Sequence, residues 1–81
     1  MDVRFAVNVA PKDGILDPQG DAVQDSLRHL GFSVDGTRIG RVVDLQIEAA
    51  DPDAARAEVE RMCEQLLANT LIESYEIEIV P

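Results

Sequence analysis

The chain has 81 residues, 46% of them hydrophobic, and carries 16 acidic and 7 basic side chains for a net charge of −9. This length predicts a single domain over residues 1–81, whose small core would gain from contact with a partner. The acidity argues against binding to nucleic acid or to anionic lipid. The only cysteine, Cys63, cannot form an internal disulfide. With no apolar run of about 20 residues and no signal-peptide pattern, these features predict a cytoplasmic protein.

The first half of the chain predicts a strand followed by a helix. Apolar and polar residues alternate over residues 3–9, which is the pattern of a strand with one buried face. Asp17 and Pro18 supply a helix cap and a first helical residue. An apolar stripe at helical spacing follows and ends at Gly31, which suits the left-handed end of a helix; it consists of Val23, Leu27 and Leu30.

The second half predicts a hairpin, a helix and a last strand. Residues 33–49 form the expected hairpin, with a weakly patterned first arm, a turn at Gly40 and a clearly alternating second arm. Asp51 and Pro52 repeat the cap-and-proline start, and Asn69 is a candidate left-handed stop. Residues 75–79 alternate as a strand. The buried stripe predicted for the second helix is Ala55, Val59, Met62, Cys63, Leu66 and Leu67.

The order β-α-β-β-α-β predicts an α+β fold, a two-layer ferredoxin-like sandwich with a four-stranded antiparallel sheet and both helices on one face. The second and fourth strands would then be unprotected edges, so we expect at least a dimer. One core should unite the sheet and both helices; its expected members are Val3, Phe5, Val7, Val23, Leu27, Val43, Leu45, Val59, Leu66 and Ile77.

No catalytic, cofactor-binding or metal-ligating motif is present. The chain lacks a phosphate-binding glycine loop with lysine and any Cys/His cluster, and its single histidine, His29, lies at the expected end of a helix. Cys63 lies on an apolar stripe, which favours an inert buried thiol over a nucleophile. A solvated sheet edge is favoured over a divalent-ion site for three neighbouring acids, Glu73, Glu76 and Glu78.

Several residues could instead contact partners. Lys12, the only lysine, lies in a turn-forming loop, while Arg38 and Arg41 flank Gly40 at the expected hairpin tip. Lys12 could contact a partner or an anionic group, although an exposed loop charge is the favoured interpretation. Arg38 and Arg41 could dock on an acidic partner, and a solvated rim fits them equally well. Tyr75, the only tyrosine, is interpreted as an anchor of a sheet edge.

Two segments carry a family resemblance. Residues 14–23 read GILDPQGDAV and residues 66–75 read LLANTLIESY, and both resemble signature segments of the PurS family. The Leu30-Gly31 step is similar to one in the family, and residues 38–41 (RIGR) resemble its Arg-x-Gly-Lys hairpin with arginine at the last position. The resemblance covers nearly the whole chain. Gly20 lies in the first segment, where a missing side chain permits close approach.

The resemblance implies a non-catalytic subunit of phosphoribosylformylglycinamidine synthase in purine biosynthesis. Its partners would be an ATP- and Mg-using synthetase chain, a glutaminase chain and copies of itself, and it would assist ammonia transfer between the two enzymes. The partner-interface residues expected on this basis are Lys12, Asp17, Gly20, Arg38, Arg41, Asn69 and Tyr75.

Two other functions fit the same predicted fold. One is an ACT-like module that binds an amino acid at a dimer interface. The other is an acylphosphatase-like enzyme, which needs an arginine-bearing phosphate loop that residues 10–14 do not provide.

Overall fold

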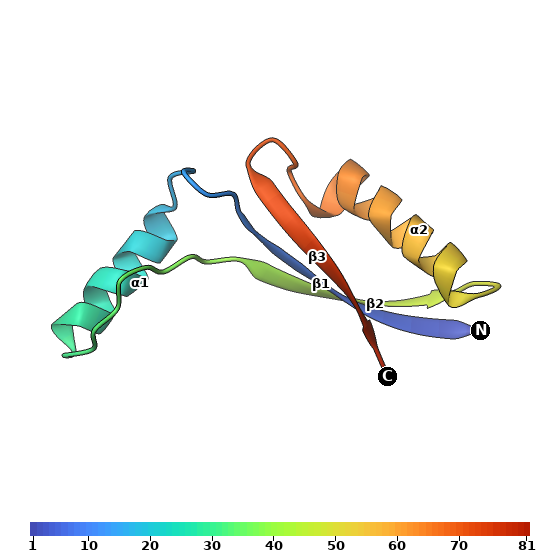
Figure 1. Cartoon of the computed structure of the whole chain (residues 1–81), viewed down its shortest axis with the longest axis horizontal. Helices are drawn as coiled ribbons and strands as arrows, with labels where there is room; N and C mark the ends of the chain where they lie inside the picture. The colour runs from blue at the N-terminus through green and yellow to red at the C-terminus, as the bar shows by residue number, and fades with distance from the viewer.

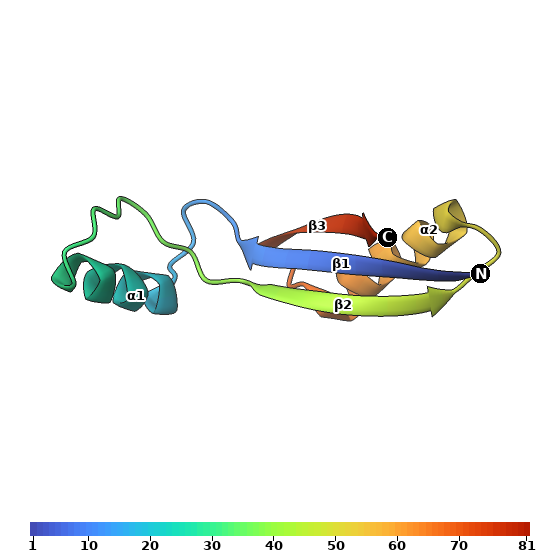
Figure 2. The same ribbon diagram turned by 90° about the horizontal axis from the view of Figure 1, so that it is seen from below.

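Three antiparallel strands form the centre of the protein, and a helix packs against one face of the sheet. The computed structural model describes residues 1–81. Along the chain the elements are β1 (Asp2–Pro11), α1 (Pro18–His29), β2 (Arg41–Glu48), α2 (Pro52–Met62), a π-helical turn η1 (Cys63–Leu67) and β3 (Glu73–Val80). The strand order is β2-β1-β3 (Figure 1). The molecule measures 50 × 27 × 14 Å because α1 lies beyond one end of the sheet (Figure 2).

The central strand β1 supplies half of the core, as its alternating sequence predicts. Its inward residues Val3, Phe5, Val7 and Val9 are all buried. They meet the inward face of α2 and of the chain that follows it; the residues buried there are Ala55, Val59, Cys63 and Ala68. Since β1 pairs with β2 on one side and β3 on the other, both outer strands are edges.

Both helices begin as their Asp-Pro sequences predict. Asp17 Oδ1 accepts a hydrogen bond from the Gly20 amide at 3.0 Å, and Asp51 Oδ1 accepts one from the Ala54 amide at 2.8 Å. Gly31 follows the Leu30 cap at the end of α1, and its φ of +96° is the left-handed conformation that glycine adopts without strain. Both predicted helix starts and the stop predicted at Gly31 are therefore confirmed.

The predicted fourth strand is absent, and so is the hairpin over residues 33–49. Residues 33–39 lie along α1 and give their backbone groups to it, because Val34 O accepts from Arg28 and the Ile39 amide donates to Asp17. Gly40 is not a hairpin tip. It lies beside β1, where a Cβ atom would overlap the carbonyl oxygen of Val9. The sheet consequently has three strands.

The prediction of two helices on one face is also wrong, because α1 does not reach the sheet. Of the predicted core residues, Val23 is 39% exposed and Leu27 is half-buried without packing against the core, so neither belongs to it; Leu30 is 73% exposed. Only α2 covers the sheet. The inward side chains of β2 lie at the margin of the face that α2 covers and remain half-buried; they are Val43, Leu45 and Ile47. An apolar helix face and part of an apolar sheet face are thus both left uncovered.

The end of α2 departs from the predicted pattern in two places. The Ala68 amide donates to Cys63 O at 3.1 Å, five residues back, so the last turn is wider than an α-helical turn. This shift buries Ala68 and leaves Leu66 83% exposed. Asn69 does not adopt a left-handed conformation; its side chain instead accepts from the Leu71 amide at 3.3 Å.

Candidate partner interface

Asp17 joins the start of α1 to the segment that returns to the sheet. Its second carboxylate oxygen, Oδ2, accepts from the Ile39 amide at 2.8 Å while Oδ1 caps the helix at Gly20. These two amides, with Ile39 the stronger influence, lower the pKa of Asp17. Gly20 has no room for a side chain, since a Cβ would lie 2.5 Å from Thr37 O and from Asp17 itself. The close approach expected at Gly20 is therefore made by the chain's own backbone.

Residues 13–39 form a braced projection, which we call the arm. Arg38 pairs with Asp13 at 3.1 Å, and Arg28 Nε donates to Val34 O at 2.8 Å, in addition to the bonds made by Asp17. The Phe32 amide bonds Leu27 O at 3.1 Å and closes the end of α1. Two connecting segments join the arm to the sheet: one follows the end of β1 and the other precedes the start of β2 (Figure 1).

Arg41 links β2 to the turn before β3. It forms a two-pronged ion pair with Glu73, at 2.7 and 3.1 Å, and donates a further hydrogen bond to Leu67 O. Glu73 also accepts from the Asn69 amide at 2.8 Å. The Arg41 guanidinium and then this amide lower the pKa of Glu73, while the hydrogen bonds that Arg41 donates to Glu73 raise the pKa of Arg41. Arg41 is thus a structural clamp rather than a free cation at a tip.

Lys12 closes the same turn from the other side. Its Nζ donates to Thr70 O at 2.6 Å, and its backbone amide donates to Ile72 O at 2.9 Å. The carbonyl groups after α2 are therefore bound by two cationic side chains, Lys12 and Arg41. Positive charge near the C-terminal end of a helix interacts favourably with the helix dipole.

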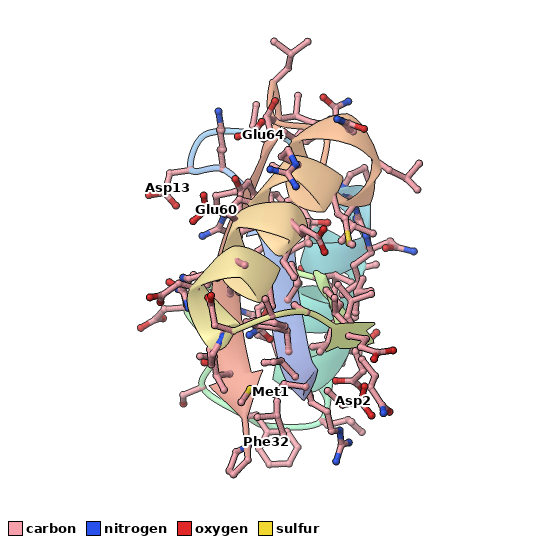
Figure 3. All side chains as sticks on the ribbon, turned by 90° about the vertical axis from the view of Figure 1, so that its right-hand side faces the viewer. Met1, Asp2, Asp13, Phe32, Glu60 and Glu64 are labelled. Carbon is pink, nitrogen blue, oxygen red and sulfur yellow. The ribbon has the colours of Figure 1, made fainter.

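Tyr75 lies in a groove between α2 and β3. Its hydroxyl donates to Glu64 Oε1 at 3.1 Å, and burial followed by this bond to a carboxylate raises the pKa of Tyr75. Two adjoining hollows form the groove and share Glu60 and Tyr75 in their walls. Figure 3 labels Glu60 of α2 and Glu64 of the following turn η1.

The seven predicted interface residues do not converge on one site. Asp17, Gly20 and Arg38 brace the arm; Lys12, Arg41 and Asn69 close the turn before β3; Tyr75 lies in the groove. The sequence analysis missed the partner of Arg41, Glu73, because the two residues are 32 positions apart. It also missed the exposure of apolar side chains outside the sheet; the most exposed are Met1, Leu16, Leu30, Phe32, Leu66 and Leu71.

Reactive groups are not gathered anywhere in the structure. No three His, Cys, Asp or Glu side chains are close enough together to hold a metal ion. Cys63 is fully buried, and burial raises the pKa of its thiol, which disfavours the reactive thiolate. No helix has the length and apolar character needed to cross a membrane. The features that point to a function are therefore exposed surfaces and not a cluster of reactive groups.

Comparison with known proteins agrees with the resemblance found in the sequence. Residues 4–81 match the PurS family model, described as phosphoribosylformylglycinamidine (FGAM) synthase. The PurS subunit of that synthase from Bacillus subtilis is 46% identical over 77 residues, covering 94% of this chain and 90% of the relative. The Synechocystis PurS subunit is 45% identical over 74 residues, covering 90% and 74%.

Solved structures match over the whole chain as well. The structure of B. subtilis PurS superposes with a TM-score of 0.84 at 43% identity and covers 100% of both chains. A chain of the PurLQS structure from Thermotoga maritima gives a TM-score of 0.93 at 31% identity and covers 99% of both. This chain therefore belongs to the PurS family of phosphoribosylformylglycinamidine synthase subunits.

Proposed function

We propose that this chain joins the synthetase chain of phosphoribosylformylglycinamidine synthase to its glutaminase chain and thereby assists ammonia transfer between them. In this proposal the synthetase uses ATP and magnesium to convert formylglycinamide ribonucleotide to its amidine. The glutaminase releases ammonia from glutamine. The present chain contributes surfaces and no reacting group.

The uncovered apolar face of α1 carries the proposal. In a chain of this size the apolar stripe of a helix normally finds its cover within the same fold, because burial is the main source of stability. Here Val23 and Leu30 lie outside any core, on an arm that is braced by its own hydrogen bonds. A well-formed helix that presents apolar residues to solvent is a surface that suits a partner.

The first partner we propose for α1 is a second copy of the chain. The inward side chains of β2, namely Val43, Leu45 and Ile47, are half-buried because α2 does not cover them fully. α1 of one copy would lie on β2 of the other and place a second helix on that sheet face. A two-fold axis lets each copy give its arm and receive one, which closes the dimer. The dimer then offers the synthetase and the glutaminase a larger surface than one small chain could.

Family membership supports the two enzyme partners, and no feature of the structure favours an ACT-like ligand site over them. The T. maritima neighbour belongs to a structure described as PurLQS, which by its name combines three kinds of chain. Because ammonia is small and neutral, its transfer needs two active sites held together and shielded from water. Holding them together requires contacts, which a subunit without catalytic groups can provide.

Native mass spectrometry of the three cognate chains tests this assembly. We expect a complex that contains all three kinds of chain when they are mixed, and no stable synthetase–glutaminase pair when this chain is left out. A synthetase–glutaminase pair that forms equally well without this chain would refute the joining role.

A further inference from the structure

The outer edge of β3 is open, and its hydrogen-bonding pattern identifies which backbone groups are free. The Ala49 amide donates to Met1 O at 2.9 Å, so the odd-numbered residues of β1 bond to β2 and its even-numbered residues bond to β3. In the β1–β3 register even-numbered residues face even-numbered ones. The N–H and C=O groups that point away from the sheet therefore belong to Tyr75, Ile77 and Ile79.

This edge lacks most of the usual protection against strand pairing. β3 is eight residues long and contains no proline, glycine or lysine. One side chain covers it: Arg56 of α2 donates to Ile77 O at 3.2 Å. A single exposed arginine can move aside, so a strand arriving from another chain meets a row of free donors and acceptors.

The side chains around this edge carry negative charge. In the β1–β3 register Glu76 and Glu78 alternate with the inward residues of β3, so they project on the sheet face away from α2, while Glu60 of α2 and Glu64 of η1 line the groove on the other face. Arg56 and Arg61 are the cations in these walls, and Arg61 lies 3.9 Å from Glu58. Glu76 and Glu78 therefore make the face away from α2 acidic, whereas Glu60 and Glu64 are matched in number by Arg56 and Arg61 on the groove face.

The same charges disfavour pairing of β3 with β3 of a second copy. Antiparallel strands related by a two-fold axis place residues i and j opposite each other with a constant sum. Centring the axis on residue 77 sets Glu76 against Glu78 twice, while centring it on 76 or 78 sets a glutamate against itself. Like charges directly opposite destabilise a strand pair.

We propose that the β3 edge is a strand-addition site for an extended, lysine- or arginine-bearing segment of another chain of the assembly. The segment would bond to the backbone of Tyr75, Ile77 and Ile79 and displace Arg56 from Ile77 O. Its cations would lie opposite Glu76 and Glu78. Only the identification of the segment's source rests on the proposed function; the site itself follows from the open edge and its charge.

A peptide tests the site on the isolated chain. The probe is an acetylated, amidated peptide of about eight residues, the length of β3, that alternates lysine with threonine or valine. We expect it to slow hydrogen exchange at the amides of Tyr75, Ile77 and Ile79, and at no amide of the outer edge of β2. The same peptide with alternate backbone nitrogens methylated, or with glutamate for lysine, should bind at least about tenfold more weakly.

Paired double variants distinguish binding at the β3 edge from a general effect of the protein's net charge. Glu76→Lys with Glu78→Lys should weaken binding about tenfold, because attractive cross-strand pairs become repulsive ones. The matched control makes the same charge change at the other edge, with Asp44→Lys and Glu48→Lys, and should leave protection of the β3 amides in place. Arg56→Ala should tighten binding, since it frees Ile77 O. Equal binding by the Glu76/Glu78 variant, or protection confined to β2, would overturn the proposal.

The intact complex identifies the occupant. A photo-crosslinking residue at Glu78 should join this chain to a basic segment of the synthetase or the glutaminase. A crosslink to a second copy, or none in a complex that native mass spectrometry finds assembled, would overturn the proposal while leaving the joining role intact. Failure of the complex to assemble would instead count against the joining role, and the peptide experiment would still decide the site.

Discussion

Truncating Leu30 should weaken self-association far more than it weakens the fold. Leu30 caps the C-terminal end of α1 and is 73% exposed in the single chain. Full burial of a leucine side chain stabilises by about 1.5–3 kcal/mol, so covering the exposed part gains about 1–2 kcal/mol. A two-fold dimer contains two such contacts. Leu30→Ala should therefore cost about 2–4 kcal/mol of association energy, which raises the dimer Kd about 30- to 1000-fold.

Sedimentation equilibrium over a range of concentrations measures this Kd directly. The matched control is Asp25→Ala, because Asp25 lies outside the apolar stripe, about 200° around the helix from Val23 and Leu27 and about 140° from Leu30. It should leave the dimer Kd unchanged within about threefold. Thermal unfolding at low concentration should report similar monomer stability for both variants. An unchanged Kd in Leu30→Ala, or equal weakening in Asp25→Ala, would refute the docking of α1 on a second copy.

Three further outcomes follow from the single-chain structure. Gly40→Ala should lower the free energy of unfolding by about 1–3 kcal/mol because a Cβ there meets a β1 carbonyl, whereas Gly36→Ala, with open space around it, should change urea unfolding little. Glu73 has a pKa held below its ordinary value of 4.5 by Arg41, so its stabilisation is present above that pH and lost as the pH falls through the lowered pKa. The wild-type unfolding midpoint should therefore drop more steeply below about pH 4.5 than that of Glu73→Gln, and equal slopes would contradict the clamp. Cys63 should react with a disulfide reagent at least about tenfold more slowly in the native chain than in urea, and equal rates would show that the thiol is not buried.

Local rules predicted the elements that depend on neighbouring residues. The alternation of β1 identified its buried face, and the Asp17-Pro18 and Asp51-Pro52 pairs located both helix starts. Each signal acts within a few residues, so no knowledge of the rest of the fold was needed. The PurS resemblance rested on the same stretches, since the capped start of α1 lies in the more specific segment.

Tertiary placement was not predictable in the same way. The stripe on α1 indicates that the helix buries one face, but not that its cover lies outside the chain's own sheet. Residues 33–39 lost their predicted strand because Asp17 and Arg28 bind their backbone groups. The wide turn after Cys63 has no sequence signal, and it moved Leu66 from the core to the surface.

In the candidate site, too, the features set by neighbouring residues were predictable and those set by tertiary contacts were not. The cap at Asp17 and the need for glycine at position 20 could be expected from sequence, although the contact proved to be internal. Arg41 was recognised as a cation, but its function depends on Glu73, which is distant in sequence and adjacent only in the sheet. The open edge of β3 became visible only once the strand order β2-β1-β3 was known.

Leaving this chain out of the reconstituted synthase tests the joining role most directly. The assay measures amidine formation by the synthetase and glutaminase chains, with either glutamine or a high concentration of ammonium as the nitrogen source. We expect glutamine-dependent activity to be lost without this chain and restored by adding it. Ammonium-dependent activity should largely persist, because ammonia from bulk solution needs no docked glutaminase. Full glutamine-dependent activity in its absence would contradict the account.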